Sequence, residues 1–150
     1  MSRLEIREPF KTAPEVLWKA ITTPETYLEL GLVKSIRRID GVDGGCWDEG
    51  ARRELVIGSW RFVEVVKNVR AGETMEVEVL ENEGPLRQDY ERLDVSPTAD
   101  GCELTWTIEF TMKRGWLRFL DPVIAATFNA AYRRVLRKLR ARIETPSSSA

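Results

Sequence analysis

The sequence predicts a single α+β domain that combines an antiparallel sheet of about six or seven strands with one long C-terminal helix, and three observations support this. Segments with the two-residue alternation of half-buried strands fill much of residues 33–112. Two short helix signals interrupt the strand pattern early, within residues 12–31. An apolar stripe with helical spacing then runs through residues 123–143. The length of 150 residues fits one domain.

The N-terminal segment opens with a strand and continues into two short helices. Apolar and polar residues alternate over residues 4–10, as in a strand with one buried face. Thr12 is followed three residues later by Glu15, which matches a capping box and predicts that a helix begins there. Thr23 before Pro24 repeats the signal, with threonine as the N-cap and proline in the first helical position.

The middle of the chain consists of strand segments separated by turns. Turn-rich pieces at residues 40–45 and 70–72 separate the first of these strands, so antiparallel pairing is expected. Apolar and acidic residues alternate over residues 75–79, which predicts that the glutamates there face water. Asp100 and Gly101 form a hairpin signal before residues 104–112, where every second residue is apolar.

One long helix ends the predicted domain. Asp121 and Pro122 supply its N-cap and first position, and about five or six turns follow. The expected buried stripe consists of Ile124, Phe128, Ala131, Val135, Leu139 and Ile143. The basic side chains of residues 133–142 should form the solvated face. Residues 145–150 predict a disordered tail, so the domain spans residues 1–144.

Composition narrows the range of functions. Lysine plus arginine (23) nearly balances aspartate plus glutamate (24), so no nucleic-acid partner is expected. The chain has no histidine, which excludes serine–histidine–aspartate, cysteine–histidine and histidine–metal sites. Cys46 and Cys102 stand far apart, and no disulfide framework, metal or other cofactor is expected. The chain lacks an apolar run of membrane-spanning length and its N-terminus is too charged for a signal peptide, which predicts a cytoplasmic protein.

Four local motifs carry a resemblance to a known family. They are residues 13–18 in the first predicted helix, Glu64 in the strand after a glycine-containing turn, Pro85 and Leu86 followed by Tyr90, and residues 101–110 with Trp106. In this order they resemble the START-like (SRPBCC) superfamily, in its polyketide cyclase/dehydrase-like branch, over nearly the whole chain. The resemblance implies a helix-grip fold, in which a curved sheet wraps the terminal helix and leaves a ligand cavity. It also implies gate loops at residues 57–59 and 83–86 and a small hydrophobic ligand such as a lipid, a quinone or a polyketide.

The ligand site is expected between the sheet and the terminal helix. The even positions of residues 60–66 share one face, which places Glu64 in the interior unless a bulge turns it to solvent. A buried carboxylate must be paired, hydrated or protonated, and its expected partner is Arg92, on the same side as Tyr90. The expected ligand-binding residues are Trp60, Phe62, Glu64, Leu86, Tyr90, Arg92, Trp106, Ile108, Phe110, Ile124, Thr127, Phe128, Ala131 and Val135. For any single apolar member, a role in the core alone is the favoured interpretation, because a helix packed on a sheet needs a core whether or not it binds a ligand.

Two further groups of residues have plainer expected roles. The acidic residues expected to be solvated are Asp89, Glu91 and Asp94. The apolar cluster before the last helix consists of Trp116, Leu117, Phe119 and Leu120. We expect this cluster to pack against the sheet, with transient membrane contact as the alternative to packing.

Three functions remain open at this point. The leading hypothesis is a cofactor-free binding or carrier protein for a small hydrophobic molecule, without stable membrane insertion. The second is an aromatase/cyclase-type enzyme, in which Glu64 or Tyr90 moves a proton. The third is a module that acts on a chaperone or on ribosomes through its surface. The sequence leaves the oligomeric state open.

Overall fold

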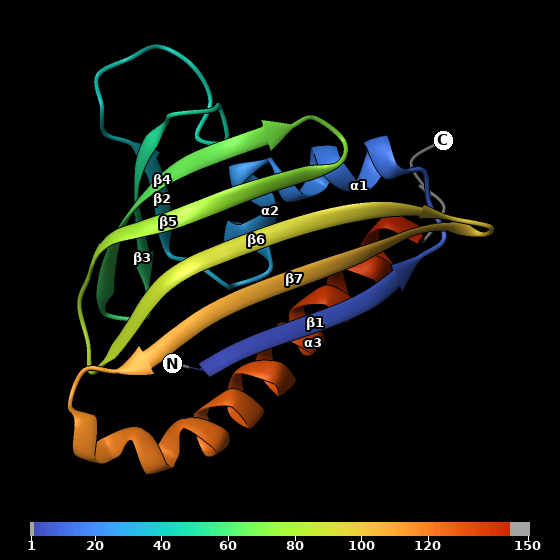
Figure 1. Ribbon diagram of the computed structural model, residues 1–150. Helices are drawn as coiled ribbons and strands as arrows, with labels where there is room; N and C mark the ends of the chain where they lie inside the picture. The colour runs from blue at the N-terminus through green and yellow to red at the C-terminus, as the bar shows by residue number, and fades with distance from the viewer. Residues whose placement is uncertain (1, 145–150) are drawn as a thin grey trace.

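The computed structural model describes residues 2–144, which form a seven-stranded sheet, three α-helices and one 3-10 helix (Figure 1). In chain order the elements are β1 (Ser2–Phe10), α1 (Pro14–Ile21), α2 (Pro24–Glu29), β2 (Ser35–Arg38), β3 (Arg52–Ile57), β4 (Trp60–Arg70), β5 (Thr74–Asn82), β6 (Leu86–Thr98), β7 (Gly101–Met112), η1 (Gly115–Leu120) and α3 (Asp121–Glu144). The predicted α+β class is confirmed, with two short helices after the first strand. The predicted tail at residues 145–150 lies outside the described residues.

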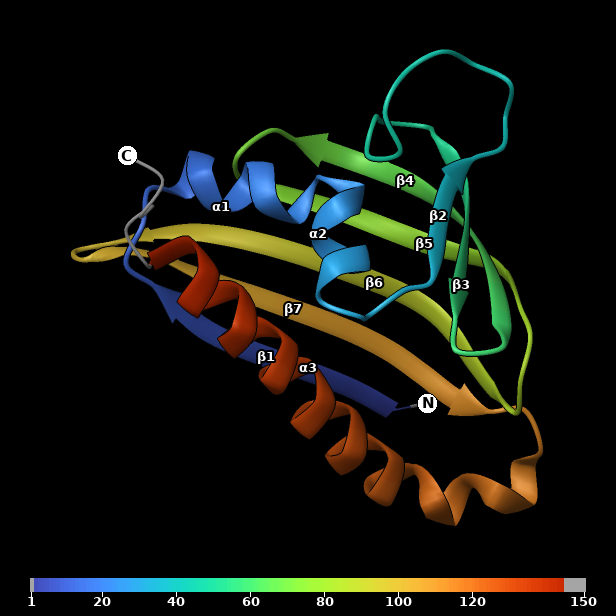
Figure 2. The ribbon, with the colours of Figure 1, turned by 180° about the vertical axis from the view of Figure 1, so that it is seen from behind.

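All neighbouring strands are antiparallel, in the order β1-β7-β6-β5-β4-β3-β2. The first strand therefore pairs with the last, and β1 and β2 form the two edges. All three α-helices lie on one face of the curved sheet, α3 across β1 and β7, and α1 and α2 over the middle strands (Figures 1 and 2). No helix of the described chain is long and apolar enough to cross a membrane.

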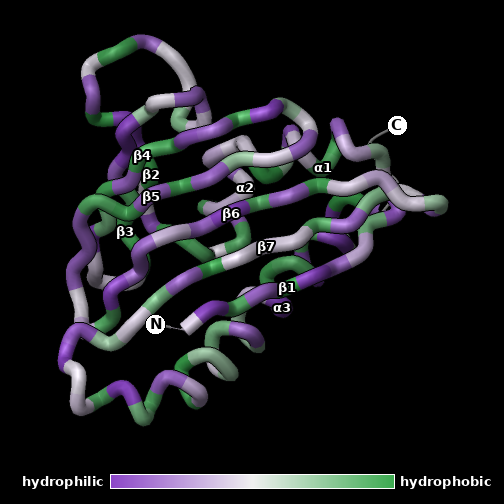
Figure 3. The backbone as a smooth tube through the Cα atoms, viewed as in Figure 1, coloured by the Kyte–Doolittle hydropathy of each residue, from purple (hydrophilic) through white to green (hydrophobic). Residues whose placement is uncertain are grey.

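Apolar and polar residues alternate along the strands, as the changing hydropathy in Figure 3 shows, and the apolar ones on the inner face form the core. The predicted inward residues of β7 are all buried, namely Leu104, Trp106, Ile108, Phe110 and Met112. Leu4, Ile6 and Phe10 continue this buried layer on β1. Burying each such side chain contributes about 1.5–3 kcal/mol to folding, so this layer supplies much of the force that holds the helices on the sheet.

The buried face of α3 differs from the predicted stripe. Leu136 and Leu139 are its most buried apolar residues, and Tyr132 packs with its ring centroid 4.7 Å from that of Trp106. Ala131, expected inside, is exposed, and Val135 is only half-buried. The helix is therefore turned by about one residue relative to the prediction, because this rotation buries Tyr132 and Leu136 in place of the smaller Ala131 and Val135.

A buried ion-pair cluster fixes α3 against β1. Glu8 on β1 is 5% exposed, and its two carboxylate oxygens accept hydrogen bonds from Arg133 (3.1 Å) and Arg140 (3.0 Å). The two arginines lie two helical turns apart and hence on one face of α3. The prediction that every basic residue of this helix is solvated is wrong for these two.

The starts of the two short helices also differ from the sequence prediction. Helix α1 begins at Pro14 with Ala13 as its N-cap, and Thr12 forms no capping box. Thr23 does occupy the N-cap of α2, but its hydroxyl donates to the carbonyl of Lys19 (2.5 Å) and caps nothing. Burial of Leu17 and Ile21, rather than side-chain capping, therefore stabilises α1.

Candidate functional site

An enclosed cavity lies in the interior, between the sheet, α2 and α3. Its volume is about 40 Å³, and its walls come from seven elements and the loops beside them. The polar and aromatic wall residues are Tyr27, Trp47, Arg53, Glu64, Gln88, Glu91, Trp106 and Tyr132, and the aliphatic ones are Leu32, Val33, Ile36, Leu55, Ile57 and Leu93. The concentration of ionisable side chains on one part of this wall distinguishes it from an ordinary core.

The first element of the cavity is a buried ion pair between Arg53 on β3 and Glu64 on β4. Arg53 Nε donates to Glu64 Oε2 at 3.0 Å, and the two residues are 4% and 3% exposed. Arg53 also donates to the carbonyl of Cys46 (3.3 Å) and lies 4.7 Å from the ring centroid of Trp47. The placement of Glu64 in the interior agrees with its predicted position.

Hairpin register explains why Arg53, which the sequence analysis did not single out, meets Glu64. The turn between β3 and β4 has Gly58 at φ 61°, a backbone conformation suited to glycine, and it pairs Ile57 with Trp60. Counting outward from that pair puts Arg53 directly opposite Glu64. The glycine turn was therefore a signal in the sequence that could have identified the partner.

The second element is Glu91 on β6, which was expected to be solvated but is 9% exposed. Its carboxylate accepts hydrogen bonds from the indole of Trp106 and from Gln88 Nε2 (3.3 Å). Burial, and secondly the negative charge of Glu64, raise the pKa of Glu91 to about 7. The group can therefore hold or release a proton near neutral pH.

A β-bulge explains why Glu91, and not Tyr90, faces the cavity. The pairing of β6 with β7 shifts between Gln88 and Tyr90, which inserts one residue and exchanges the two faces of the strand. Gln88 points inward before the bulge, and Glu91 and Leu93 point inward after it. The prediction placed Tyr90 and Arg92 on the side of the cavity, which an unshifted alternation from Leu86 and Gln88 would have done.

Tyr90 and Arg92 consequently lie on the opposite face of the sheet from the cavity. The Tyr90 hydroxyl donates to Glu76 (3.0 Å), and Arg92 pairs with Asp94 (2.9 Å) and Glu76 (3.5 Å). The predicted ion pair between Glu64 and Arg92 is therefore wrong. Its place is taken by Arg53.

The other predicted site residues are dispersed around the cavity. Trp106 lines it, whereas Phe62 packs beside it in a smaller cluster with Val33 and Leu55. Ile108 and Phe110 are fully buried in the main core. The half-buried residues packed against that core are Leu86, Ile124 and Phe128.

Three predicted site residues lie at the surface. Trp60 is 44% exposed, and its ring lies so close to Gly84 that an added Cβ there would approach it to 2.8 Å. Thr127 and Ala131 lie on the exposed side of α3, and the Thr127 hydroxyl donates to the carbonyl of Val123 (2.9 Å). Residues on this side of α3 point away from the cavity.

Tyr27 and Trp47 close the cavity on the side of α2. Their rings stack with centroids 5.4 Å apart, and the Tyr27 hydroxyl donates to the carbonyl of Ile21 (2.5 Å). Trp47 is buried, yet its Nε1 finds no hydrogen-bond partner within residues 2–144. The stack thus forms a lid that has a free donor beside the charged wall.

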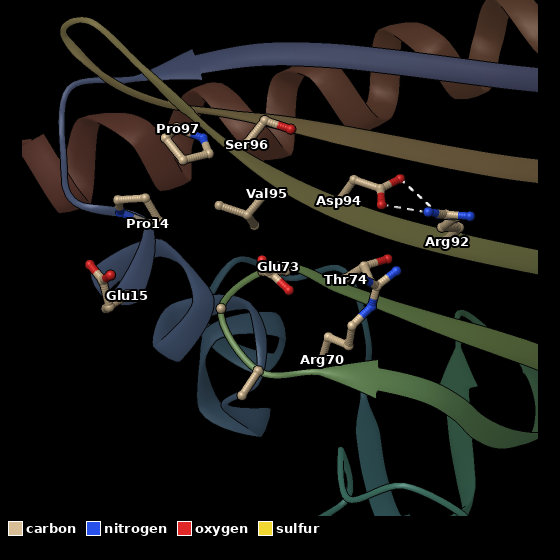
Figure 4. A pocket seen from close by; sticks show the side chains of 12 residues that line it. Pro14, Glu15, Arg70, Glu73, Thr74, Arg92, Asp94, Val95, Ser96 and Pro97 are labelled. Atoms are coloured by element: carbon tan, nitrogen blue, oxygen red, sulfur yellow. Dashed lines mark hydrogen bonds and ion pairs between the residues drawn. The ribbon is translucent and has the colours of Figure 1, made fainter.

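A larger depression, of about 550 Å³, lies on the surface beside the start of α1 and the turn between β4 and β5 (Figure 4). It is wide open, and its charged side chains include Arg92 and Asp94, which pair with each other. Because this depression is open to solvent and its only buried side chain without a hydrogen-bond partner among residues 2–144 is the neutral hydroxyl of Thr74, the interior cavity is the better candidate site despite its smaller volume.

Comparison with known proteins identifies the family. A family model described as polyketide cyclase / dehydrase and lipid transport matches residues 1–144. The chain belongs to this family. No curated protein matches it in sequence.

Solved structures confirm the fold of this family member. TTHA0849 from Thermus thermophilus is 13% identical at a TM-score of 0.75, covering 98% of this chain and 100% of that chain. The Aha1 dimer from Colwellia psychrerythraea is 14% identical at a TM-score of 0.68, and the match covers 98% of this chain and 99% of that chain. Ara h 8.0201 is 13% identical at a TM-score of 0.69, and the match covers 95% of this chain and 97% of that chain. At these identities the likeness concerns the fold alone.

In this family member the cavity wall combines three kinds of polar group. Arg53 supplies a fixed positive charge, Trp47 a free N–H donor, and Glu91 a carboxyl that exchanges its proton near neutral pH. The remaining wall is aliphatic and aromatic. Such a wall can hold an apolar molecule and orient one oxygen-bearing end of it.

Proposed function

We propose that this protein binds a small, mainly apolar molecule that carries an oxygen acceptor, within the cavity between the sheet and α3. The observation that carries the proposal is the buried cluster of Arg53, Glu64 and Glu91 on the cavity wall. Membership of a family described by polyketide chemistry and lipid transport supports the same class of ligand.

Energetics favour a functional role for this cluster over a purely structural one. Burying an ion pair costs several kcal/mol of desolvation per ion, and well-packed apolar residues of similar volume often give equal or greater stability. Glu91 adds a second carboxyl beside Glu64, which raises the cost further. Arrangements of this kind concentrate at binding and catalytic sites.

The ligand must displace the lid in order to enter. Pockets for drug-sized ligands usually measure about 300–1,000 Å³, whereas the closed cavity measures about 40 Å³. Tyr27 packs against both hydrophobic clusters, but it lies on α2, a six-residue helix with no fully buried residue, and such a segment can move more easily than the sheet. An outward movement of the Tyr27–Trp47 stack would enlarge the cavity and offer the Trp47 indole N–H to the ligand.

Native mass spectrometry of freshly purified protein, followed by denaturing extraction, tests the proposal. We expect a bound small molecule in the wild type and at least a tenfold lower occupancy in Arg53→Met/Glu64→Met, which keeps the wall volume but removes the buried ion pair. The matched control is Lys67→Met/Glu78→Met, which removes an exposed ion pair from β4 and β5.

Two results would contradict ligand binding. One is a clean ligand-free mass together with no thermal stabilisation by a panel of lipids, quinones and polyphenols. The other is equal occupancy in the wild type and the Arg53→Met/Glu64→Met variant. Because the double replacement should reduce stability far less than Arg53→Met alone, loss of the ligand can be separated from unfolding.

A second candidate, a cyclase or dehydratase, is favoured by one observation, the pKa of about 7 at Glu91. A carboxyl with this pKa can take or give a proton at neutral pH, which typically contributes 10²–10⁴-fold to a rate. Turnover of a poly-β-ketone should fall by that factor in Glu91→Gln. It should be unchanged in Tyr90→Phe, because Tyr90 faces away from the cavity. Equal effects of the two variants would exclude this role for Glu91.

A further inference from the structure

Large apolar side chains are exposed where η1 meets α3. Trp116, Phe119 and Val123 are 68%, 69% and 63% exposed, and we call these three residues the apolar tip. The expectation that the cluster before α3 packs on the sheet is therefore wrong for Trp116 and Phe119, while Leu117 is half-buried. Leaving two aromatic rings in water is unfavourable, and exposed apolar groups of this size mark contact surfaces.

Unpaired cations lie next to the apolar tip and along α3. Arg114 and Arg118 flank the tip within η1 and its preceding residue. A second group, which we call the basic stripe, consists of Arg134, Arg137 and Lys138. None of these five cations has an acidic partner among residues 2–144.

Most cations on the strands are paired within the described chain, although Arg3, Arg52 and Arg70 are not. Arg37 pairs with Glu54, Lys67 with Glu78 and Arg87 with Asp89. In the sequence between Lys113 and Ile143, by contrast, the only acidic residue is Asp121. That residue is buried and accepts a hydrogen bond from Ser2 (2.9 Å).

The apolar tip and the basic stripe share one side of the molecule. Val123, Thr127, Arg134 and Lys138 recur at three- to four-residue intervals or their multiples, and all are exposed, so they lie on the outer face of α3. Figure 2 shows that η1, drawn in orange, extends beyond the end of the sheet and that α3 runs on from it along the outside of the molecule. A flat surface laid against α3 could therefore meet both groups.

We propose that the apolar tip and the basic stripe dock this protein on an anionic lipid membrane. Trp116 and Phe119 insert at the level of the headgroups, where amphipathic aromatic rings are favoured. The two cations beside the tip and the three of the basic stripe then face the lipid phosphates. Each basic residue near an anionic surface adds to the attraction. The interaction is peripheral, because the apolar tip is too short to span a bilayer.

The shape of the surface favours a membrane over a protein partner. Trp116 and Phe119 come from the six-residue 3-10 helix η1 and Val123 from the first turn of α3, a segment too short to offer a partner helix or strand an extended apolar groove. A nucleic acid would use the cations but would leave Phe119 and Val123 in water. Only a surface with an anionic exterior and an apolar interior satisfies both groups.

Co-sedimentation of the full chain with vesicles tests this proposal, which does not depend on what the cavity binds. The vesicles are phosphatidylcholine alone or with about one third phosphatidylglycerol. We expect at least tenfold stronger partitioning to the anionic vesicles, weakened by salt. Trp116→Ser/Phe119→Ser should reduce that partitioning at least tenfold, and Arg134→Gln/Arg137→Gln/Lys138→Gln should remove most of the preference for anionic lipid.

Matched controls come from surfaces remote from the apolar tip. Val42→Ser changes a 59%-exposed apolar side chain in the loop before β3, and Arg37→Gln/Arg87→Gln removes two paired surface cations. Both should partition like the wild type, and all variants should melt within a few degrees of it because the altered residues are exposed. Membrane docking is refuted if wild-type protein prefers neither vesicle, or if the controls lose as much binding as the tip variant. Undiminished binding of the tip variant would also refute it and would indicate a purely electrostatic polyanion surface.

Discussion

Replacing Glu91 with glutamine should change how the free energy of unfolding depends on pH. In the folded protein, burial and the nearby Glu64 raise the pKa of Glu91 to about 7 from the ordinary value of 4.5. Between these values the folded state keeps the proton that the unfolded state releases. Each pKa unit corresponds to about 1.4 kcal/mol, so the wild type loses about 3 kcal/mol of stability from this group as the pH rises from about 4.5 to about 7.

The glutamine variant isolates this contribution because it is similar in size and keeps an oxygen to accept the Trp106 hydrogen bond. Urea denaturation of both proteins at several pH values from about 4.5 to 8 gives the difference in unfolding free energy. We expect Glu91→Gln to gain about 3 kcal/mol relative to wild type across this window. A difference that stays constant over the whole range would refute the assignment of a raised pKa to Glu91.

Glu76 lies on neighbouring β5, on the opposite face of the sheet, and provides a control because its pKa is shifted in the opposite direction to that of Glu91. Hydrogen bonds from Asn68 (2.6 Å) and Tyr90 (3.0 Å) lower its pKa, the Asn68 bond being the larger cause. The ionised carboxylate of Glu76 therefore stabilises the folded protein at any pH above its ordinary pKa. This contribution is lost as the pH falls through the lowered pKa of the folded state. The destabilisation caused by Glu76→Gln should accordingly shrink as the pH falls below about 4.

Three further predictions concern stability and can be checked by urea denaturation. Arg53→Met alone should destabilise the protein by about 3–5 kcal/mol because it leaves Glu64 buried and unpaired, and adding Glu64→Met should recover most of that loss. Leu136→Ala should cost about 2–5 kcal/mol whereas Thr127→Ala should change stability by less than about 0.5 kcal/mol, and equal costs would contradict the observed orientation of α3. Gly101→Ala should cost more than about 1 kcal/mol, because the new Cβ would collide with the backbone at the end of β1.

The sequence predicts the fold well wherever a local period decides the structure. Residues 104–112 show this most clearly, because each apolar residue of the alternation is buried as expected. The long C-terminal helix was predicted for the same reason, but its orientation was not. Two neighbouring stripes, one with Ala131 and Val135 and one with Tyr132 and Leu136, are both compatible with helical spacing. Contact with Trp106 on the sheet selects between them.

The candidate site was harder to predict because it depends on strand register. Glu64 was placed correctly because its pairing with β3 continues without a shift from the turn at Gly58, although β4 carries a register shift toward β5 next to it. Glu91 was missed because one inserted residue in β6 exchanges the faces of everything that follows, which also moved Tyr90 and Arg92 to the outside. Arg53 has no periodic signature, and only pairing across the hairpin reveals its role.

The pairing of the first strand with the last has a consequence for how the chain is made. Phe10 on β1 is paired with Cys102 on β7, so the partner of β1 is among the last strands to be synthesised. At translation rates of about 5–20 residues per second, the intervening segment takes roughly ten seconds to appear. For that time the apolar face of β1 has no native strand beside it and no α3 to cover it. Among the strands of the sheet, β1 is thus the one for which a nascent-chain chaperone matters most, and its delayed pairing sets a lower limit on the time to the native state during synthesis.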